Sequence, residues 1–291
     1  MAFSDRDDDS IYSLFALDID GTMIGADRIV HADLVAAIGR VQSLGATVSI
    51  ATGRALAPAL RVAEQAGAAG PVICFQGAMT FDPVAHSELR HVRLSWDSTT
   101  RAISGLTEKV SVVMLFLHGD VWVERRTDWI DGYVERMGLA IRYSDSLISM
   151  ADRGPTSIVG VGDPATIEAA VSSLRTQLDG SALVTHSLPN LCEVEAIGAG
   201  KDLAVEHLAT RLGITKANVV AVGDEKGDRT MVEWAGLGVA IEGGDPELMA
   251  IADVVIARPE ESGLAEFLES LADSGRIGPS PPVASAGRAR Q

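Results

Sequence analysis

Two aspartates one residue apart, Asp18 and Asp20, follow the apolar run 12–17 and precede a Gly-Thr pair. An apolar run bounded by turn residues predicts a buried strand, along which residues two apart face the same side. We therefore expect both carboxylates at the carboxyl end of a buried strand, where open α/β sheets bind ligands. Adjacent negative charges are costly there unless a cation or a shared proton relieves them, and oxygen ligands of this kind suit Mg²⁺.

Further polar residues follow an apolar run or begin a predicted helix: Thr52, Lys201, Asp224 and Asp228. We expect all of them at one rim of the sheet, where they would form the set that phosphoryl transfer needs. Asp18 fits the attacking carboxylate, and Asp20 fits the acid that protonates the leaving oxygen and then deprotonates water. Asp18 and Asp224 fit a metal site, while Thr52 and Lys201 fit the phosphate.

Each of these residues also has a purely structural interpretation. Aspartates favour turns, and Thr52 or Asp228 can cap the helix that follows. Lys201 can pair with Asp202 at the surface, although a cation at a helix start opposes the helix dipole by about 0.3–1 kcal/mol, which favours an anionic partner. Arg54 is either a substrate contact or a solvated helix residue.

Apolar runs alternate with helical patterns in the first and last thirds of the chain. Strands are expected at 46–52, 71–75, 218–224, 238–241 and 253–257, and helices at 32–44, 202–212 and 263–272. This alternation is typical of βαβ units, so the expected fold class is α/β, with a parallel Rossmann-like sheet and helices on both faces.

The middle of the chain has a different pattern, with short strands and tight connections such as the hairpin turn predicted at 118–120. We expect residues 83–190 to form an inserted α+β cap. Residues 11–82 and 191–273 would then form a discontinuous catalytic core. Residues 1–10 and 274–291 lack apolar periodicity and are expected to be disordered tails.

Composition excludes several classes of protein. The chain has 291 residues, 47% of them hydrophobic, with a formal net charge of −16 and a pI of about 4.7. Nucleic acids and anionic membranes require a basic face, so neither is an expected partner. No apolar run approaches the roughly 18 residues of a membrane span, and the acidic N-terminus does not resemble a secretory signal. With only Cys74 and Cys192, both expected to be reduced, a cytoplasmic protein is the plain expectation.

Taken together, these motifs resemble those of haloacid dehalogenase superfamily phosphatases, in the Cof-like branch with a large α/β cap. The first family motif, DxDGT, matches 18–22, and the second, a Thr or Ser ending a strand, matches Thr52. The third, a lysine opening a helix just after the cap, matches Lys201. The fourth, GDxxND, matches 223–228. The resemblance covers roughly residues 13 to 271.

The resemblance implies a role for each matched residue. Asp18 would be the nucleophile, and Asp20 the acid/base and a main-chain Mg²⁺ ligand. Asp224 would be a further metal ligand, and Asp228 would support the metal or bind it. Phosphate binding is expected of three residues: Thr52, Gly53 and Lys201.

The chain departs from the family pattern at two positions. Gly227 stands where the fourth motif usually has asparagine, and Gln76 stands where the third strand is usually followed by Asn-Gly-Ala. Together with Arg54, these two residues are the candidate substrate contacts, and the departures leave the identity of the substrate open.

The sequence therefore predicts a Mg²⁺-dependent phosphatase of a small phosphorylated metabolite, either a sugar phosphate or a phosphorylated cofactor. It would act through an aspartyl-phosphate, as a monomer or homodimer, with the cap closing over the site to exclude water and choose the leaving group. Two alternatives stay open: a phosphomutase built on the same core, and a non-catalytic regulator that binds a phosphorylated metabolite.

Overall fold

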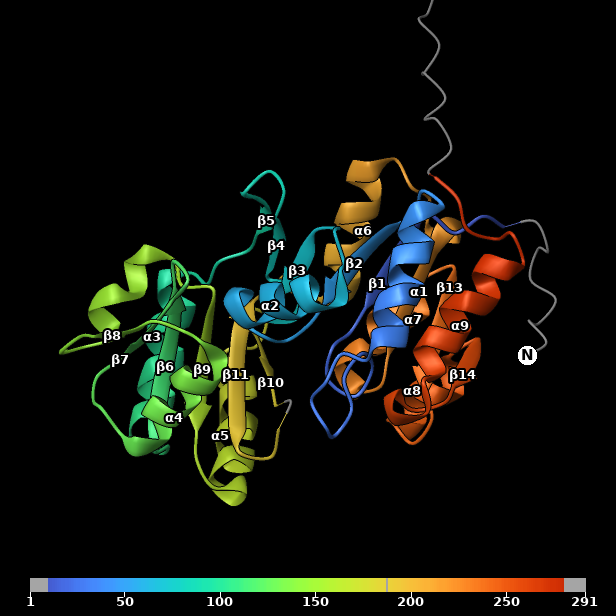
Figure 1. Cartoon of the computed structure of the whole chain (residues 1–291). Coiled ribbons are helices and arrows are strands. Elements are labelled where there is room, and N and C mark those ends of the chain that lie inside the picture. The colour runs from blue at the N-terminus through green and yellow to red at the C-terminus, as the bar shows by residue number, and fades with distance from the viewer. Residues whose placement is uncertain (1–9, 187, 280–291) are drawn as a thin grey trace, which may run out of the picture. The chain divides into compact units, whose positions relative to one another are not determined.

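The computed structural model describes residues 10–186 and 188–279 (Figure 1). These residues divide into two compact units. The first unit runs up to Ile50 and resumes at Gln65–Gly70 and from Val205 onward, while the second comprises Ala51–Glu64 and Pro71–Ala204. The cap boundaries expected at residues 83 and 190 stay a prediction. Most of the expected tails, 1–9 and 280–291, lie outside the described residues.

The first unit contains a parallel sheet. Its strands, in order across the sheet, are β14 (Val254–Ile256), β13 (Leu237–Ile241), β12 (Val219–Gly223), β1 (Leu14–Leu17) and β2 (Thr47–Ala51). The neighbours pair in parallel, and Leu17 lies opposite both Val222 and Ile50. The β1–β12 pairing joins segments from the two ends of the chain, so the residues that follow these strands become neighbours.

Helices cover both faces of this sheet. They are α1 (Ala32–Ser43), α7 (Arg229–Trp234), α8 (Pro246–Ile251) and α9 (Gly263–Asp273), with α2 (Leu56–Ala66) and α6 (Lys201–Leu212) spanning the two units. Every residue of β1, β12 and β13 is buried, which requires cover on both sides, and α1 packs against α9 (Figure 1). The expected α/β fold class is confirmed, because uniformly apolar runs are typical of parallel strands covered on both faces.

The second unit contains a three-stranded antiparallel segment and a six-stranded sheet. The segment consists of β3 (Val72–Cys74), β4 (Met79–Asp82) and β5 (Ser87–His91). The six-stranded sheet has the order β10 (Ala182–Thr185), β11 (Leu191–Ala196), β9 (Ser157–Val161), β6 (Val112–Leu117), β7 (Asp120–Val123) and β8 (Ile141–Tyr143). Three helices belong to it: α3 (Trp96–Thr107), α4 (Asp128–Met137) and α5 (Pro164–Gln177).

The six-stranded sheet is antiparallel except for the β7–β8 pair, as an α+β unit requires. The expected hairpin turn is present between β6 and β7, where His118 and Gly119 have φ values of 54° and 84°. The remaining short helical turns are η1 (Phe75–Gly77), η2 (Ile148–Arg153), η3 (Lys216–Asn218), η4 (Lys226–Asp228) and η5 (Pro259–Glu261).

The start of the expected C-terminal tail is packed against the first unit. Ile277 is 7% exposed and forms a parallel bridge with Tyr12, whose N–H donates to the Arg276 carbonyl at 2.8 Å. The Arg276 guanidinium lies 5.1 Å from the centre of the Tyr12 ring. Ile277 and Arg276 therefore hold this part of the expected tail against Tyr12.

Two further sequence expectations concern the cysteines and the membrane. Cys74 and Cys192 are both buried and free, and burial raises the pKa of the Cys192 thiol to about 12. Within the described ranges, none of the helices has the length and apolar character that crossing a bilayer requires.

The two faces of the six-stranded sheet differ in character. One face packs an apolar cluster, including Leu115, Ile158 and Val194, against α3 and α5. On the other face Glu195 is only 3% exposed, and its Oε1 accepts a hydrogen bond from the Ser157 hydroxyl at 3.1 Å. Burial raises the pKa of Glu195 well above its ordinary value, and the nearby charge of Glu193 raises it further.

We predict that Glu195 makes the protein less stable as pH rises. Its carboxyl holds a proton in the folded state at pH values where the unfolded chain, with an ordinary pKa near 4.5, has lost it. The favourable contribution of Glu195 to the free energy of unfolding is therefore complete below the unfolded-state pKa. It is lost as pH rises through the raised folded pKa. Glu195→Gln should be more stable than wild type at pH 9 by about 1–3 kcal/mol, and the gap should shrink towards pH 5.

Urea unfolding of both proteins at several pH values measures this difference. Glu168→Gln, which changes an exposed acid on α5, is the matched control and should follow the wild-type curve. A difference between Glu195→Gln and wild type that does not change with pH would contradict the prediction.

Candidate active site

Asp18 is the first residue after β1. Its N–H donates to the Val222 carbonyl at 3.0 Å, so the pairing of β1 with β12 extends one residue beyond the strand. The residue is 6% exposed. Because β1 is central and fully buried, the Asp18 backbone is held firmly at the carboxyl end of the parallel sheet.

The sequence pattern predicted that Asp18 and Asp20 share one face of a strand. In the structure both residues lie beyond the end of the strand. The strand ends at Leu17, and the Ile19 carbonyl accepts hydrogen bonds from the N–H groups of Met23 and Ile24, both at 2.9 Å, which turns the chain. Asp20 is exposed whereas Asp18 is buried. The two-residue alternation of a strand therefore does not apply across this pair, and its two carboxylates lie in different environments.

Asp224 and Asp228 follow the neighbouring strand, β12. The Asp224 carbonyl accepts the Asp245 N–H at 2.7 Å, which fixes the backbone at this point. Asp228 ends the short turn η4, and its Oδ2 accepts the N–H groups of Asp224 and Glu225, each at 3.1 Å. The Asp228 side chain thus closes a turn that brings it back against Asp224.

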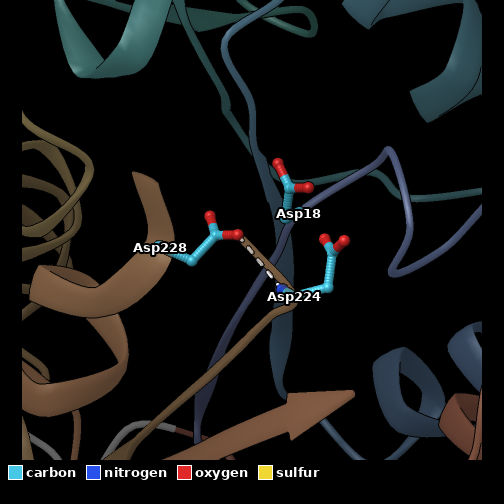
Figure 2. Close-up of side chains that lie close together, drawn as sticks. All are labelled: Asp18, Asp224 and Asp228. Carbon is cyan, nitrogen blue, oxygen red and sulfur yellow. Dashed lines mark hydrogen bonds between the residues drawn. The ribbon is translucent and has the colours of Figure 1, made fainter. Parts of the chain in front are cut away.

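Asp18, Asp224 and Asp228 come together in a compact cluster (Figure 2). One carboxylate oxygen from each lies within 4.8 Å of the others, and the three residues are 6%, 8% and 1% exposed. The Thr22 hydroxyl donates to Asp224 Oδ1 at 3.0 Å. Three buried carboxylates at this spacing provide hard oxygen ligands and repel one another, so the cluster suits a divalent cation such as Mg²⁺.

Two glycines make room for this cluster. Gly21 has a φ of +79°, and a Cβ atom there would overlap the Asp224 carboxylate. A Cβ atom on Gly223 would overlap the Asp228 side chain. Gly21, Thr22 and Gly223 therefore have functions that the sequence analysis did not assign, although all three stand inside the motifs that it identified.

Apart from Gly227, the other candidate residues lie in the second unit. Thr52 is 1% exposed, and its N–H donates to the Ile73 carbonyl at 2.9 Å, which places it beside β3. Its hydroxyl oxygen accepts the Arg54 N–H at 3.2 Å, so Thr52 closes a turn in the loop before α2, which begins at Leu56, and the helix cap of its structural interpretation stays a prediction. This hydrogen bond uses one lone pair of the hydroxyl and is compatible with a hydrogen bond from that hydroxyl to phosphate.

Arg54 is half-buried and belongs to the same loop. Burial raises the pKa of the Tyr133 hydroxyl and the charge of Glu193 raises it further, while the charges of Arg136 and then Arg54 lower it. Arg54 therefore lies within electrostatic range of a tyrosine on α4, in the region expected to select the substrate.

Gln76 lies in the left-handed turn η1, immediately after β3. Phe75 and Gln76 both have a φ of 51°, and Gly77 follows at 91°. A Cβ atom on Gly53 would overlap the Gln76 side-chain amide, so these two candidate residues are direct neighbours. The longer side chain of Gln76, compared with the asparagine of the family pattern, is thus directed at the loop that carries Thr52.

Lys201 is the first residue of α6 and is 5% exposed. The residue before it, Gly200, contacts the η1 turn so closely that a Cβ atom on Gly77 would overlap the Gly200 carbonyl. The second unit therefore brings the Thr52 loop, the Gln76 turn and the start of α6 together. Gly227 is exposed in η4 of the first unit, beside Asp228.

The structure thus groups the predicted residues into two sets. Asp18, Asp224 and Asp228 meet in the first unit, and Thr52, Gly53 and Gln76 lie together in the second. The expectation that all of them share one rim stays a prediction.

Comparison with known proteins agrees with this geometry. Residues 15–268 match the family model of haloacid dehalogenase-like hydrolases. A phosphoglycolate phosphatase from Methanopyrus kandleri is 30% identical over 260 residues, covering 89% of this chain and 97% of that protein. A 5-amino-6-(5-phospho-D-ribitylamino)uracil phosphatase from Bacillus subtilis is 24% identical over 265 residues, covering 88% and 96%.

Among solved structures, a haloacid dehalogenase-like hydrolase from Bacteroides thetaiotaomicron is similar with a TM-score of 0.81 at 22% identity. The match covers 89% of this chain and 99% of that one, so the likeness of fold extends over nearly the whole chain. The family model covers well over half of the sequence, and the resemblance found in the motifs is confirmed. The chain therefore belongs to the haloacid dehalogenase-like hydrolases.

Proposed function

We propose that this hydrolase is a Mg²⁺-dependent phosphatase that releases inorganic phosphate from a small phosphorylated metabolite through an aspartyl-phosphate. The observation that carries the proposal is the cluster of three buried carboxylates directly after two adjacent parallel strands. The relatives found by comparison support the activity, since both are named as phosphatases and their names describe small phosphorylated substrates.

Asp18, Asp224 and Asp228 are the residues that would hold the cation, with the Asp20 main chain as a further ligand by family resemblance. A divalent ion bound there supplies positive charge that offsets the repulsion between an attacking carboxylate and an anionic phosphate. Two of the three side chains are held by hydrogen bonds from the protein, since the Thr22 hydroxyl donates to Asp224 and two backbone N–H groups donate to Asp228.

Asp18 and Asp20 would carry the covalent chemistry. An Asp18 carboxylate oxygen attacks phosphorus, and the bond from phosphorus to the leaving oxygen breaks as Asp20 gives that oxygen a proton. A water then attacks the phosphorus of the aspartyl-phosphate and gives its proton to Asp20, which releases phosphate and restores the Asp18 carboxylate. The exposure of Asp20 suits a group that must meet substrate and water in turn.

The second unit would supply the phosphate and substrate contacts. Thr52, Gly53 and Lys201 bind the phosphate in this proposal, and Arg54 and Gln76 contact the substrate, as does Gly227 of the first unit. The cap expected at 83–190 selects the leaving group. The free thiols of Cys74 and Cys192, together with a metabolite substrate, support a cytoplasmic location.

A panel of phosphorylated metabolites, incubated with and without Mg²⁺ and assayed for inorganic phosphate, tests the proposal. Phosphate release that depends on Mg²⁺ supports it. Formation of an isomeric sugar phosphate without phosphate release would indicate a phosphomutase instead, and binding without turnover would indicate a regulator.

We predict that Asp18→Asn reduces kcat by at least about 10³-fold, because the amide is a far weaker nucleophile than the carboxylate. The melting temperature should not fall, since the change is isosteric and removes one of three mutually repelling charges. Asp273→Asn, an exposed acid at the end of α9, is the control and should keep full activity. Near wild-type turnover by Asp18→Asn would rule out the covalent mechanism.

We predict that Asp228→Asn raises the Mg²⁺ concentration needed for half-maximal activity by about 10–100-fold. The variant removes one charge from the cluster and one of two equivalent acceptors for the backbone N–H groups of Asp224 and Glu225. Titration of phosphatase activity with MgCl₂ measures the shift, and Glu247→Gln on α8 serves as the control. An unchanged Mg²⁺ titration would exclude Asp228 from any part in the metal site.

A further inference from the structure

The left-handed turn η1 connects two motif segments that are far apart in the sequence. On one side, the Phe75 N–H donates to the Arg54 carbonyl at 2.9 Å and the Gln76 N–H donates to the Thr52 carbonyl at 3.2 Å. On the other side, Gly77 lies against the main chain of Gly200, directly before Lys201. The position of the turn therefore affects both the Thr52 loop and the start of α6.

This turn is conformationally costly. Phe75 and Gln76 occupy the left-handed region, at about 1–3 kcal/mol for each non-glycine residue, and persist there only if their surroundings hold them. The Thr52 loop supplies hydrogen bonds to the first half of the turn. The second half, at Gly77, needs a restraint from elsewhere.

Arg90 on β5 supplies that restraint. One guanidinium nitrogen donates to the Gly77 carbonyl, and another donates to the Gly198 carbonyl. The planar guanidinium of Arg90 thus joins the end of the turn to the segment that leads into α6. Burial lowers the pKa of Arg90, which the charge of Asp202 partly opposes, so this is a partly desolvated guanidinium beside the first turn of that helix.

The segment that Arg90 holds is short and tightly folded. The Ala199 N–H donates to the Ala196 carbonyl at 2.9 Å, and Gly198 has a φ of 92°. The Gly200 carbonyl accepts the Ala204 N–H at 3.0 Å, so the α6 hydrogen bonds begin only two residues after Gly198. A displacement of Gly198 therefore moves the helix start, and Lys201 with it.

We infer that Arg90 is a positioning residue for the phosphatase reaction, which clamps the Gln76–Gly77 turn to the start of α6 and thereby aims Lys201 at the phosphate. The inference rests on the proposed function, because it takes Lys201 as a phosphate ligand. Lysine at position 90 could not replace the guanidinium, since its ammonium is a single point charge that does not present two fixed nitrogens to separate carbonyls.

Arg90→Ala tests the inference by activity. It should lower kcat/KM by about 10–100-fold, as expected when a catalytic group is misplaced by a change outside the reacting centre. Guanidinium ion at millimolar concentration should restore part of the loss, and ammonium at the same ionic strength should not. Arg90→Lys should remain impaired. Arg93→Ala is the matched control, because Arg93 is near Arg90 in sequence but pairs with Glu88 at the surface, and its activity should stay within about twofold of wild type.

A double-mutant cycle of orthophosphate binding tests this inference separately from the proposed function. Orthophosphate binding in the presence of MgCl₂ is measured by calorimetry for wild type, Arg90→Ala, Lys201→Met and the double variant. If Arg90 acts through Lys201, Arg90→Ala weakens binding about tenfold in the wild-type background and adds little in the Lys201→Met background. Thermal unfolding of each variant shows that it is folded.

Two results would overturn the inference: equal weakening by Arg90→Ala in both backgrounds, or orthophosphate binding that does not depend on Lys201. Neither depends on turnover. Absence of phosphate release by wild type, or full activity of Asp18→Asn, would refute the proposed function alone.

Discussion

The burial of three carboxylates in one small volume is the constraint on which the first unit depends. Two full charges within 4.8 Å of each other repel by at least about 3 kcal/mol at an effective dielectric constant of about 20, so gathering Asp18, Asp224 and Asp228 has a substantial electrostatic cost. The protein offsets part of this cost with oriented dipoles, namely the Thr22 hydroxyl and the N–H groups of Asp224 and Glu225. The remaining charge is what makes the cluster suitable for a divalent cation.

Strand order accounts for how residues from both ends of the chain reach this cluster. The sequence predicted the buried parallel strands themselves but not their order. The runs that became β1, β12 and β13 are apolar at nearly every position, a pattern typical of strands covered on both faces. Their boundaries differ from the expected ones by one or two residues. The prediction that Asp18 and Asp20 alternate along one strand was wrong, because β1 ends at Leu17 and the chain turns at Ile19.

Other features had no local signal in the sequence. Nothing in Phe75 or Gln76 favours a positive φ, and the turn depends on hydrogen bonds to Thr52 and Arg54 and on the guanidinium of Arg90. An arginine in a short strand is typical of a solvated edge, so the bonds from Arg90 to two distant carbonyls could not be inferred from its sequence context. The position of Thr22 against Asp224 likewise depends on the pairing of β1 with β12.

The groups that locate the Gln76 turn are mostly backbone carbonyls, those of Thr52, Arg54, Gly77 and Gly198. Backbone acceptors are present whatever side chain a residue carries. Side chains at positions 54 and 76 can therefore be exchanged during evolution while the frame around them keeps its shape. A lineage built on this arrangement is free to acquire new substrates by point mutation without first losing its ability to act on phosphate esters.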